Sequence, residues 1–183
     1  MEFSKKTREL SIKKLQERTL DLLIIGGGIT GAGVALQAAA SGLETGLIEM
    51  QDFAEGTSSR STKLVHGGLR YLKQFDVEVV SDTVSERAVV QQIAPHIPKP
   101  DPMLLPVYEE EGATFSLFRL KVAMDLYDLL AGVNNTPAAN KVLSKEEVLE
   151  REPELKKEGL VGGGVYLDFR NNDARLVIEN IKR

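Results

Sequence analysis

Residues 22–49 have the sequence LLIIGGGITGAGVALQAAASGLETGLIE, and this stretch decides the fold. Its first four residues form an apolar run that predicts a buried strand ending at a glycine turn. Gly26, Gly28 and Gly31 then stand in the spacing GxGxxG. In a dinucleotide-binding turn, the first glycine allows a tight bend and the second lets backbone N–H groups approach a pyrophosphate. The third lets the following helix pack closely on the strand.

A helix and a second strand complete this unit. The sequence predicts the helix at about Thr30–Ala40, where its first N–H groups and the positive end of its dipole can meet phosphates. A predicted strand at Thr45–Ile48 ends at Glu49, whose carboxylate suits hydrogen bonds to ribose hydroxyls and would repel a 2′-phosphate. The complete strand–helix–strand pattern predicts an α/β fold that holds an ADP-containing dinucleotide, either FAD or NAD.

The composition limits the classes of function. The chain has 183 residues, of which 42% are hydrophobic and 27% are charged, as expected for a soluble α/β domain with a sizeable core. A formal charge of −4 argues against nucleic-acid binding. Because there is no cysteine and only two histidines, we expect no metal site. We find neither a secretory signal nor a transmembrane run in the sequence, and the expected location is the cytoplasm.

The remaining segments are interpreted as architecture. Residues 1–20 are polar and net basic, which indicates a helical extension on the surface; a helix lying on a membrane is the second interpretation. Apolar spacing and stop signals predict helices at Phe75–Ile93, Phe115–Leu130 and Lys145–Arg151, strands at Met103–Tyr108 and Gly162–Phe169, and a last helix capped by Asn172 or Asp173. Since that helix has no terminator, we expect the chain to be the N-terminal part of a larger protein.

A basic segment without acids follows the nucleotide unit. No acidic residue lies between Glu55 and Asp76, whereas four cations do: Arg60, Lys63, Arg70 and Lys73. The same segment carries the hydroxyls of Thr57, Ser58, Ser59, Ser61 and Thr62, followed by the pair Gly67–Gly68. Hydroxyls, backbone N–H groups and cations together are what an anion site requires. A solvated basic loop is the alternative.

This segment carries a resemblance to a known family. The run GTSSRSTKLVHGGLRYL, with GGGITGAG before it and YLDFRNNDARL after it, resembles the FAD-dependent glycerol-3-phosphate dehydrogenase/oxidase family. The amino-acid sequence of these motifs is most similar to that of the oxidases of Gram-positive cocci. The resemblance implies a Rossmann-like FAD-binding domain of the glutathione-reductase/D-amino-acid-oxidase type, truncated before its later strands and substrate domain. Residues 21–183 would be its N-terminal part, with substrate-domain segments starting at about residue 95.

The resemblance also implies a set of site residues. Those that would bind FAD are Gly26, Gly27, Gly28, Ile29, Thr30, Gly31, Glu49, Met50, Thr57, Ser58, Ser59, Ser61, Lys63, Leu64, His66, Gly67, Gly68 and Leu69. Arg70 and Tyr71 would contribute to the pocket for the substrate phosphate, where a guanidinium binds phosphate oxygens bidentately. Arg70 in a salt bridge or on a helix surface is the alternative. His66 is the candidate catalytic residue, either as the base or as a positioning hydrogen-bond partner near the flavin.

The family implies the oxidation of sn-glycerol 3-phosphate to dihydroxyacetone phosphate, with a hydride passing to FAD and the electrons then reaching O2 as H2O2. A quinone in place of O2 would make the protein a dehydrogenase, with peripheral membrane contact as a further expectation. Two other hypotheses stay open on the residues alone. One is an NAD-dependent dehydrogenase built on the same first unit, and the other is an inactive nucleotide-binding fragment.

Overall fold

The computed structural model describes residues 3–74, 76–109 and 116–183. It forms two compact units. Unit 1 comprises Met1–Lys63 and Asn171–Arg183, and unit 2 comprises Leu64–Arg170. Unit 2 is therefore inserted in the sequence of unit 1. The domain division expected from the sequence, with substrate-domain segments from about residue 95, stays a prediction.

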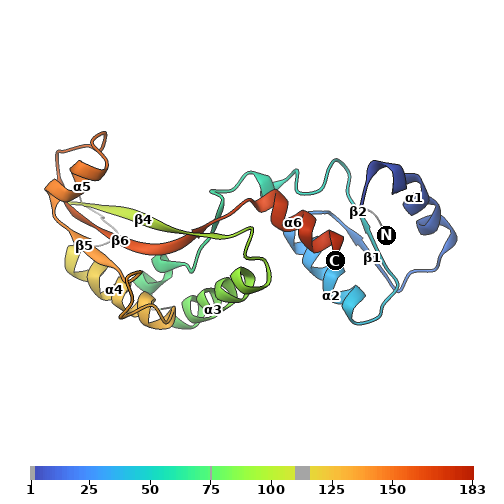
Figure 1. Cartoon of the computed structure of the whole chain (residues 1–183), viewed down its shortest axis with the longest axis horizontal. Helices are drawn as coiled ribbons and strands as arrows, with labels where there is room; N and C mark the ends of the chain where they lie inside the picture. Colours follow the sequence, from blue (N-terminus) through green and yellow to red (C-terminus); the bar gives the residue numbers. More distant parts are fainter. Residues whose placement is uncertain (1–2, 75, 110–115) are drawn as a thin grey trace. The chain divides into compact units, whose positions relative to one another are not determined.

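Unit 1 contains the predicted strand–helix–strand. Its elements are a 3-10 turn at Lys5–Thr7, α1 (Arg8–Glu17), β1 (Leu22–Ile25), α2 (Ile29–Ala40), β2 (Thr45–Ile48), a 3-10 turn at Thr57–Ser59 and α6 (Asp173–Lys182). Strands β1 and β2 are parallel, with Leu22 opposite Thr45 and Ile25 opposite Ile48. Helix α6 lies beside α2 (Figure 1). Both predicted strands and the crossover helix are confirmed, and the helix begins one residue earlier than expected.

Small side chains bring the helices of unit 1 together. Ala32 of α2 and Val177 of α6 are completely buried, and they form one cluster with Ala54. An alanine stripe leaves room for a second helix, because its side chains are short. The last segment of unit 1 therefore packs on its nucleotide-binding helix.

The N-terminal helix α1 carries no buried residue. Its Leu15 side chain nevertheless approaches β2 closely, because a Cβ built on Gly46 would lie 2.8 Å from Leu15 Cδ2. That contact favours the surface-helix interpretation over the membrane-lying one. In the described part of the chain, no helix is both long and apolar enough to cross a membrane.

Unit 2 is an antiparallel sheet with helices. Its elements are β3 (Leu64–Val65), a 3-10 helix at Leu69–Gln74, α3 (Val77–Ile93), β4 (Lys99–Tyr108), α4 (Leu117–Leu130), β5 (Lys141–Leu143), α5 (Lys145–Arg151) and β6 (Leu160–Arg170). Strand β6 pairs with all three of the others, and its pairing with β4 runs from Lys99 opposite Arg170 to Tyr108 opposite Leu160. The long strand β6 is thus the centre of this unit.

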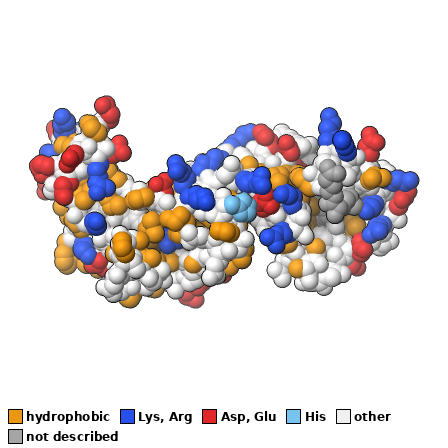
Figure 2. All heavy atoms as spheres, in the orientation of Figure 1, with side chains coloured by type: hydrophobic (Ala, Val, Ile, Leu, Met, Phe, Trp, Pro, Cys, Tyr) orange, Lys and Arg blue, Asp and Glu red, His pale blue; other side chains and the backbone are white. Residues whose placement is uncertain are grey.

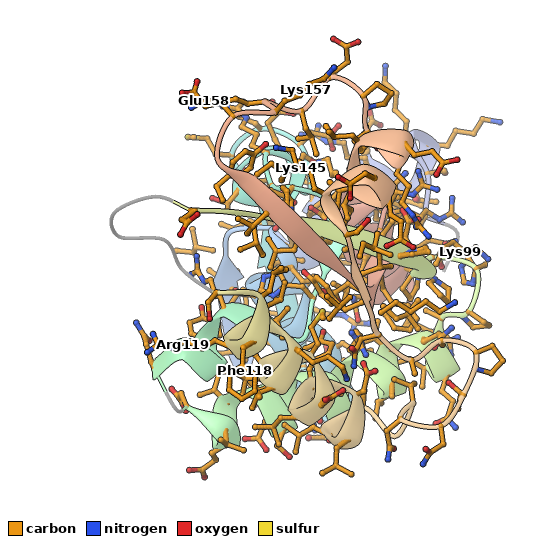
Figure 3. All side chains as sticks on the ribbon, turned by 90° about the vertical axis from the view of Figure 1, so that its left-hand side faces the viewer. Lys99, Phe118, Arg119, Lys145, Lys157 and Glu158 are labelled. Carbon is orange, nitrogen blue, oxygen red and sulfur yellow. The ribbon has the colours of Figure 1, made fainter. Side chains whose placement is uncertain are left out.

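The sheet of unit 2 is covered on both faces. Leu105 and Val107 of β4 pack in the cluster that contains Leu120 and Met124 of α4. Leu104 of β4 packs instead with Val148 of α5. Successive strand residues point to opposite faces, so α4 and α5 cover different sides. Figure 3 shows Phe118 and Arg119 of α4 on one side of the sheet, with Lys157 and Glu158 on the other.

The sequence underestimated the strands. Strand β4 begins at Lys99 rather than Met103, because Pro100 and Pro102 suggested a loop. Among the described strands β4 pairs only with β6, and an edge strand tolerates prolines, which need no partner for a missing N–H. Strands β3 and β5 were not predicted, and at two and three residues they are too short to show a period. The predicted helix starts at Phe75 and Phe115 lie outside the described residues.

Gly31 supports a first prediction. A Cβ at Gly31 would lie 1.9 Å from the backbone oxygen of Gly26, whereas a Cβ at Gly33 on the same helix would meet nothing within 4 Å. We expect Gly31→Ala to lower the free energy of unfolding by about 3 kcal/mol, the upper range for overpacking. Gly33→Ala should leave it unchanged or raise it by up to about 1 kcal/mol, since alanine is the better helix former. Urea unfolding of the two variants measures this, and equal stabilities would contradict the close contact.

Candidate functional site

The glycine turn of unit 1 is held from both sides. Gly26 has a φ of +114°, and its N–H donates to the carbonyl of Ile48 over 2.8 Å. The N–H of Gly27 donates to Glu49 Oε2 over 2.7 Å. The carbonyl of Gly27 accepts from the N–H of Ala54 over 2.9 Å. The turn is therefore fixed to the end of β2 and to the loop that follows it.

The first turn of α2 meets the hydroxyl-rich loop. Gly28 is the N-cap of α2 and offers no side chain to cap it. The first helical N–H, of Ile29, donates instead to Ser58 Oγ over 2.9 Å. A Cβ on Gly28 would lie 3.2 Å from the same oxygen. The glycine turn and the loop predicted to share an anion with it are thus in direct contact, and the Ser58 hydroxyl keeps its own proton to donate.

Glu49 accepts two backbone hydrogen bonds. One carboxylate oxygen accepts from Gly27 N–H and the other from Gln51 N–H, at 2.7 and 3.0 Å. These bonds, that from Gly27 first, lower the pKa of Glu49 below its ordinary value. Each oxygen has a second lone pair, so the carboxylate can still accept from two ribose hydroxyls.

The basic segment is less positive than its sequence suggested. Arg60 pairs with Glu55 at 3.2 Å, and Lys63 Nζ lies 4.0 Å from Asp173 Oδ2. The Ser61 hydroxyl also bonds to Asp173, and Lys63 Nζ donates to the carbonyl of Ser59. Asp173 lies far away in the sequence, which is why the charge count of the segment missed it. Two of the four cations are compensated in unit 1, and the side chain of Lys73 lies outside the described part.

The start of α6 closes this region of unit 1. The N–H of Asn171 donates to the carbonyl of Lys63 over 2.7 Å. Asn172 caps α6 by accepting from Arg175 N–H over 3.0 Å, which confirms one of the two predicted caps. Asp173 instead accepts from Asn171 Nδ2 over 2.6 Å. The helix start and the hydroxyl-rich loop are therefore one hydrogen-bonded assembly.

The other candidate residues lie in unit 2. His66 is exposed, while Gly67 and Gly68 are buried. The N–H of Gly68 donates to His66 Nδ1 over 3.1 Å, so a neutral His66 carries its proton on Nε2. An imidazole in this tautomer offers a donor at Nε2. The geometry therefore favours the hydrogen-bond role over the base role that the sequence left open.

Arg70 keeps its charge exposed. It stacks on the Tyr71 ring at 5.0 Å and donates to the Tyr71 hydroxyl over 3.2 Å. No acidic partner within 4.0 Å is found for it among the described residues, in contrast to Arg60 and Lys63. The salt bridge considered from the sequence is not formed with any described residue, whereas the other alternative, a position on a helix surface, agrees with the exposed place of Arg70 on the 3-10 helix Leu69–Gln74. The stacked guanidinium is oriented and retains donors for an anion.

Not all candidate side chains are placed alike. The candidates from Gly26 to Lys63 belong to unit 1, and those from Leu64 to Tyr71 belong to unit 2. Met50 is 90% exposed, whereas Leu69 is 5% exposed in the core of unit 2. Leu69 can therefore offer a ligand only its backbone. No cluster of three or more potential metal ligands occurs within the described residues.

The sequence missed one polar cluster, formed by Arg87, Tyr127 and Asp168. Arg87 donates to Asp168 Oδ1 over 2.9 Å and to the Tyr127 hydroxyl over 2.7 Å. It follows Val80 and Val84 at i+7 and i+3, on the buried stripe of α3. In the sequence, a charged residue on the apolar stripe of a helix is the signal that could have indicated a buried polar partner. The sequence assigned no chemistry to α3 and α4, and it did not reveal that they contribute Arg87 and Tyr127 to this cluster.

The geometry defines a dinucleotide-binding α/β protein. A parallel crossover places its glycine turn, a helix N-terminus and a terminal carboxylate together, which is the arrangement of that class. The chain belongs to the FAD-dependent oxidoreductase (DAO) family, whose model matches residues 21–183. The predicted fold class, and FAD as the cofactor of the family, are confirmed.

Individual relatives are closely similar. The chain is 95% identical over all of its length to an alpha-glycerophosphate oxidase of Streptococcus pneumoniae, and 90% identical to one of Streptococcus pyogenes. It spans 30% of the length of each. A solved glycerol-3-phosphate dehydrogenase of Bacillus halodurans, complexed with FAD, matches 99% of the chain with a TM-score of 0.68 and 42% identity. The chain covers 27% of that structure.

A pH prediction follows from Glu49. Its pKa is lower in the folded protein than in the unfolded one, so its contribution to stability is complete above the unfolded value, about 4.5. That contribution is lost as the pH falls through the folded value. Carboxyl-carbon NMR should show a Glu49 midpoint below 4.5, and Glu49→Gln should flatten the loss of stability in acid. A midpoint at or above 4.5 would contradict the two backbone bonds.

Proposed function

We propose that this chain is part of an enzyme that oxidises sn-glycerol 3-phosphate to dihydroxyacetone phosphate with FAD and transfers the electrons to O2, forming H2O2. The observation that carries this proposal is the 95% identity, over all 183 residues, to a protein named alpha-glycerophosphate oxidase. The site supports it, because the dinucleotide turn is complete and is followed in the sequence by the Arg70 guanidinium, which has no acidic partner among the described residues. The proposal assigns the protein to glycerol metabolism.

The residues of unit 1 would hold the ADP half of FAD. The pyrophosphate would lie at the N-terminus of α2, where Gly28 leaves room and the Ser58 hydroxyl has a proton to donate. Glu49 would accept from the ribose hydroxyls. Further contacts are assigned to Gly26, Gly27, Ile29, Thr30, Gly31, Met50, Thr57, Ser59, Ser61 and Lys63. Helix dipole and hydroxyl donors suit a diphosphate, since both present positive charge to it.

The residues after Lys63 would serve the flavin ring and the substrate. When bound, FAD supplies the hydride acceptor. Leu64 and the segment His66–Leu69 would flank its ring, with His66 donating a hydrogen bond from Nε2. Arg70 would bind the substrate phosphate bidentately and Tyr71 would orient the guanidinium from below. The base that removes the hydroxyl proton is not assigned to this chain.

The identity of the electron acceptor is part of the proposal. Relatives at 95% and 90% identity are named oxidases, whereas the dehydrogenase match is 42% identical, which favours O2 over a quinone. A cytoplasmic location belongs to the same proposal, because the ionised substrate does not cross a bilayer unaided. Membership of an FAD-dependent family argues against an NAD-dependent enzyme. An inactive fragment remains the competing hypothesis for the 183 residues by themselves, since they span 30% of their relatives.

The proposal predicts a yellow, substrate-reducible protein. The full-length protein containing this chain should retain FAD, and its visible bands should bleach when sn-glycerol 3-phosphate is added without oxygen. Readmitting air should restore the bands and produce one H2O2 per substrate. The enantiomeric phosphate is the control for binding at the phosphate alone. A colourless protein that binds NAD would contradict the proposal, and bleached bands restored only by a quinone would contradict the oxidase assignment.

Arg70 provides a separate prediction. Arg70→Lys keeps the positive charge but loses the planar pair of donors, so substrate affinity should fall by about 1–3 kcal/mol, the range for hydrogen bonds to charged groups. Flavin content should not change. Arg60→Lys is the matched control, because Arg60 already pairs with Glu55. Titration of flavin bleaching with substrate measures both variants. Loss of flavin with unchanged substrate affinity would show that Arg70 serves the cofactor instead.

A further inference from the structure

Beneath the His66–Gly68 turn, unit 2 buries a charged cluster. Arg87 is 4% exposed, Asp168 2% and Tyr127 0%. Three elements contribute one residue each: α3, α4 and β6. Arg87 lies 4.6 Å from the ring centre of Phe169, and its NH1 group donates to Asp168, Tyr127 and the carbonyl of Leu167. The cluster thus ties both helices to the central strand.

The cluster reaches the turn through one backbone amide. The N–H of Gly67 donates to the Tyr127 hydroxyl at 3.0 Å and to Asp168 Oδ1 at 3.3 Å. The carbonyl of Gly67 lies 3.0 Å from the Thr83 hydroxyl, which shares its one proton between this carbonyl and those of Val79 and Val80 in α3, at 2.7 and 3.1 Å. A Cβ on Gly67 would lie 2.4 Å from the Tyr127 hydroxyl oxygen. Only glycine lets the backbone rest directly on the buried groups, so Gly67 is held through the N–H of one of its peptide groups and the carbonyl of the other.

A buried ion pair is a costly way to stabilise a fold. The desolvation of both charges opposes their attraction, and apolar residues of similar size often serve stability as well or better. Burial raises the pKa of Asp168, although the hydrogen bond from Arg87 lowers it. Burial also raises the pKa of Tyr127, which keeps the hydroxyl protonated. Such a pair gives directional hydrogen bonds that an apolar cluster lacks. Here Asp168 and Tyr127, the two side-chain partners of Arg87, also accept from the N–H of Gly67.

The backbone of the His66–Gly68 turn determines the orientation of the His66 imidazole. The N–H of Gly68, the next residue, donates to His66 Nδ1 over 3.1 Å. Fixing the backbone on both sides of Gly67 therefore fixes both the imidazole orientation and its Nε2–H tautomer.

We propose that Arg87, Tyr127 and Asp168 are positioning residues, which fix the His66–Gly68 turn and so direct the Nε2–H of His66. None of the three has to contact substrate or cofactor. The proposal rests on the proposed function in one respect, namely that a flavin ring lies against this turn. The rigidity of the turn itself is independent of that function.

Tyr127→Phe tests the proposal in the full-length protein. It removes the oxygen that accepts from both Gly67 and Arg87, but keeps the ring that packs edge-on against Tyr166. Tyr108→Phe is the matched control, since Tyr108 packs on the other face of the sheet. Thr83→Val is the second variant, because it removes the hydroxyl that reaches the Gly67 carbonyl and leaves the ion pair intact.

Two measurements decide the outcome. Amide exchange of the 66–69 segment should become about tenfold faster in Tyr127→Phe and Thr83→Val, the effect of one lost hydrogen bond. In the flavin-loaded protein, kcat should fall about tenfold with KM unchanged, because a mispositioned donor acts on the reacting complex and not on phosphate binding. The control should match the wild type in both.

Other results would overturn the proposal. Unchanged exchange in both variants would show that the cluster does not fix the turn. Faster exchange with a wild-type flavin spectrum and kcat would show that the cluster serves the fold only. If the wild-type protein takes up no flavin, the proposed function fails instead, and the exchange measurement still decides whether the cluster fixes the turn.

Discussion

The structure of unit 1 depends on one steric constraint, the contact between the Cα of Gly31 and the carbonyl of Gly26. A Cβ at that position would approach the carbonyl oxygen to 1.9 Å, so α2 can lie this close to the turn only without a side chain there. The closeness brings the N–H of Ile29 to the Ser58 hydroxyl and aligns the helix N-terminus with the loop. The packing of α6 on Ala32 follows from the same helix position. A single missing methyl group therefore underlies both the packing and the candidate anion site.

The ion pairs of the two units differ in their exposure to solvent. In unit 1, ionised groups lie near the surface and compensate one another, as Lys63 and Asp173 do at 4.0 Å. In unit 2, Arg87 and Asp168 are almost fully buried, and each is the ionic partner of the other. Figure 2 shows that other Lys, Arg, Asp and Glu side chains lie on the visible surface of both units. Solvent screens the first arrangement and leaves its loop adaptable. The second is unscreened, so its geometry is fixed by directional bonds.

The sequence predicted the parts of the fold in which every local signal agrees. The unit at residues 22–49 combines apolar strands, helix spacing and glycines, and its elements were predicted almost to the residue. The start of α5 is another such case, because Ser144 and Glu147 form a capping box there and this pair is a local sequence signal. Long-range pairing was not visible. The charge of Lys63 is balanced by Asp173, more than a hundred residues later, and no local count reveals such a partner.

The same limit applies to the buried cluster. Arg87, Tyr127 and Asp168 lie on three elements that only the sheet of unit 2 brings together. Arg87 on an apolar stripe was a local sign of a buried partner, but the sign does not say which residue the partner is. At β4 the prolines predicted a loop where the structure has a strand, because a proline interrupts a central strand but is tolerated in a strand at the edge of a sheet. Tertiary context decides both cases.

The insertion of unit 2 has a consequence for how such a chain changes in evolution. Lys63 and Asn171, which flank the insertion, are joined by a backbone hydrogen bond of 2.7 Å, and the next residues inward, Leu64 and Arg170, are strand partners. The two entry points of the inserted segment are therefore neighbours, and closing unit 1 without that segment would need almost no extra chain. Joining ends that already meet carries little entropic penalty. A nucleotide-binding host of this kind can exchange its guest module for one of another length or specificity while its own scaffold stays in place.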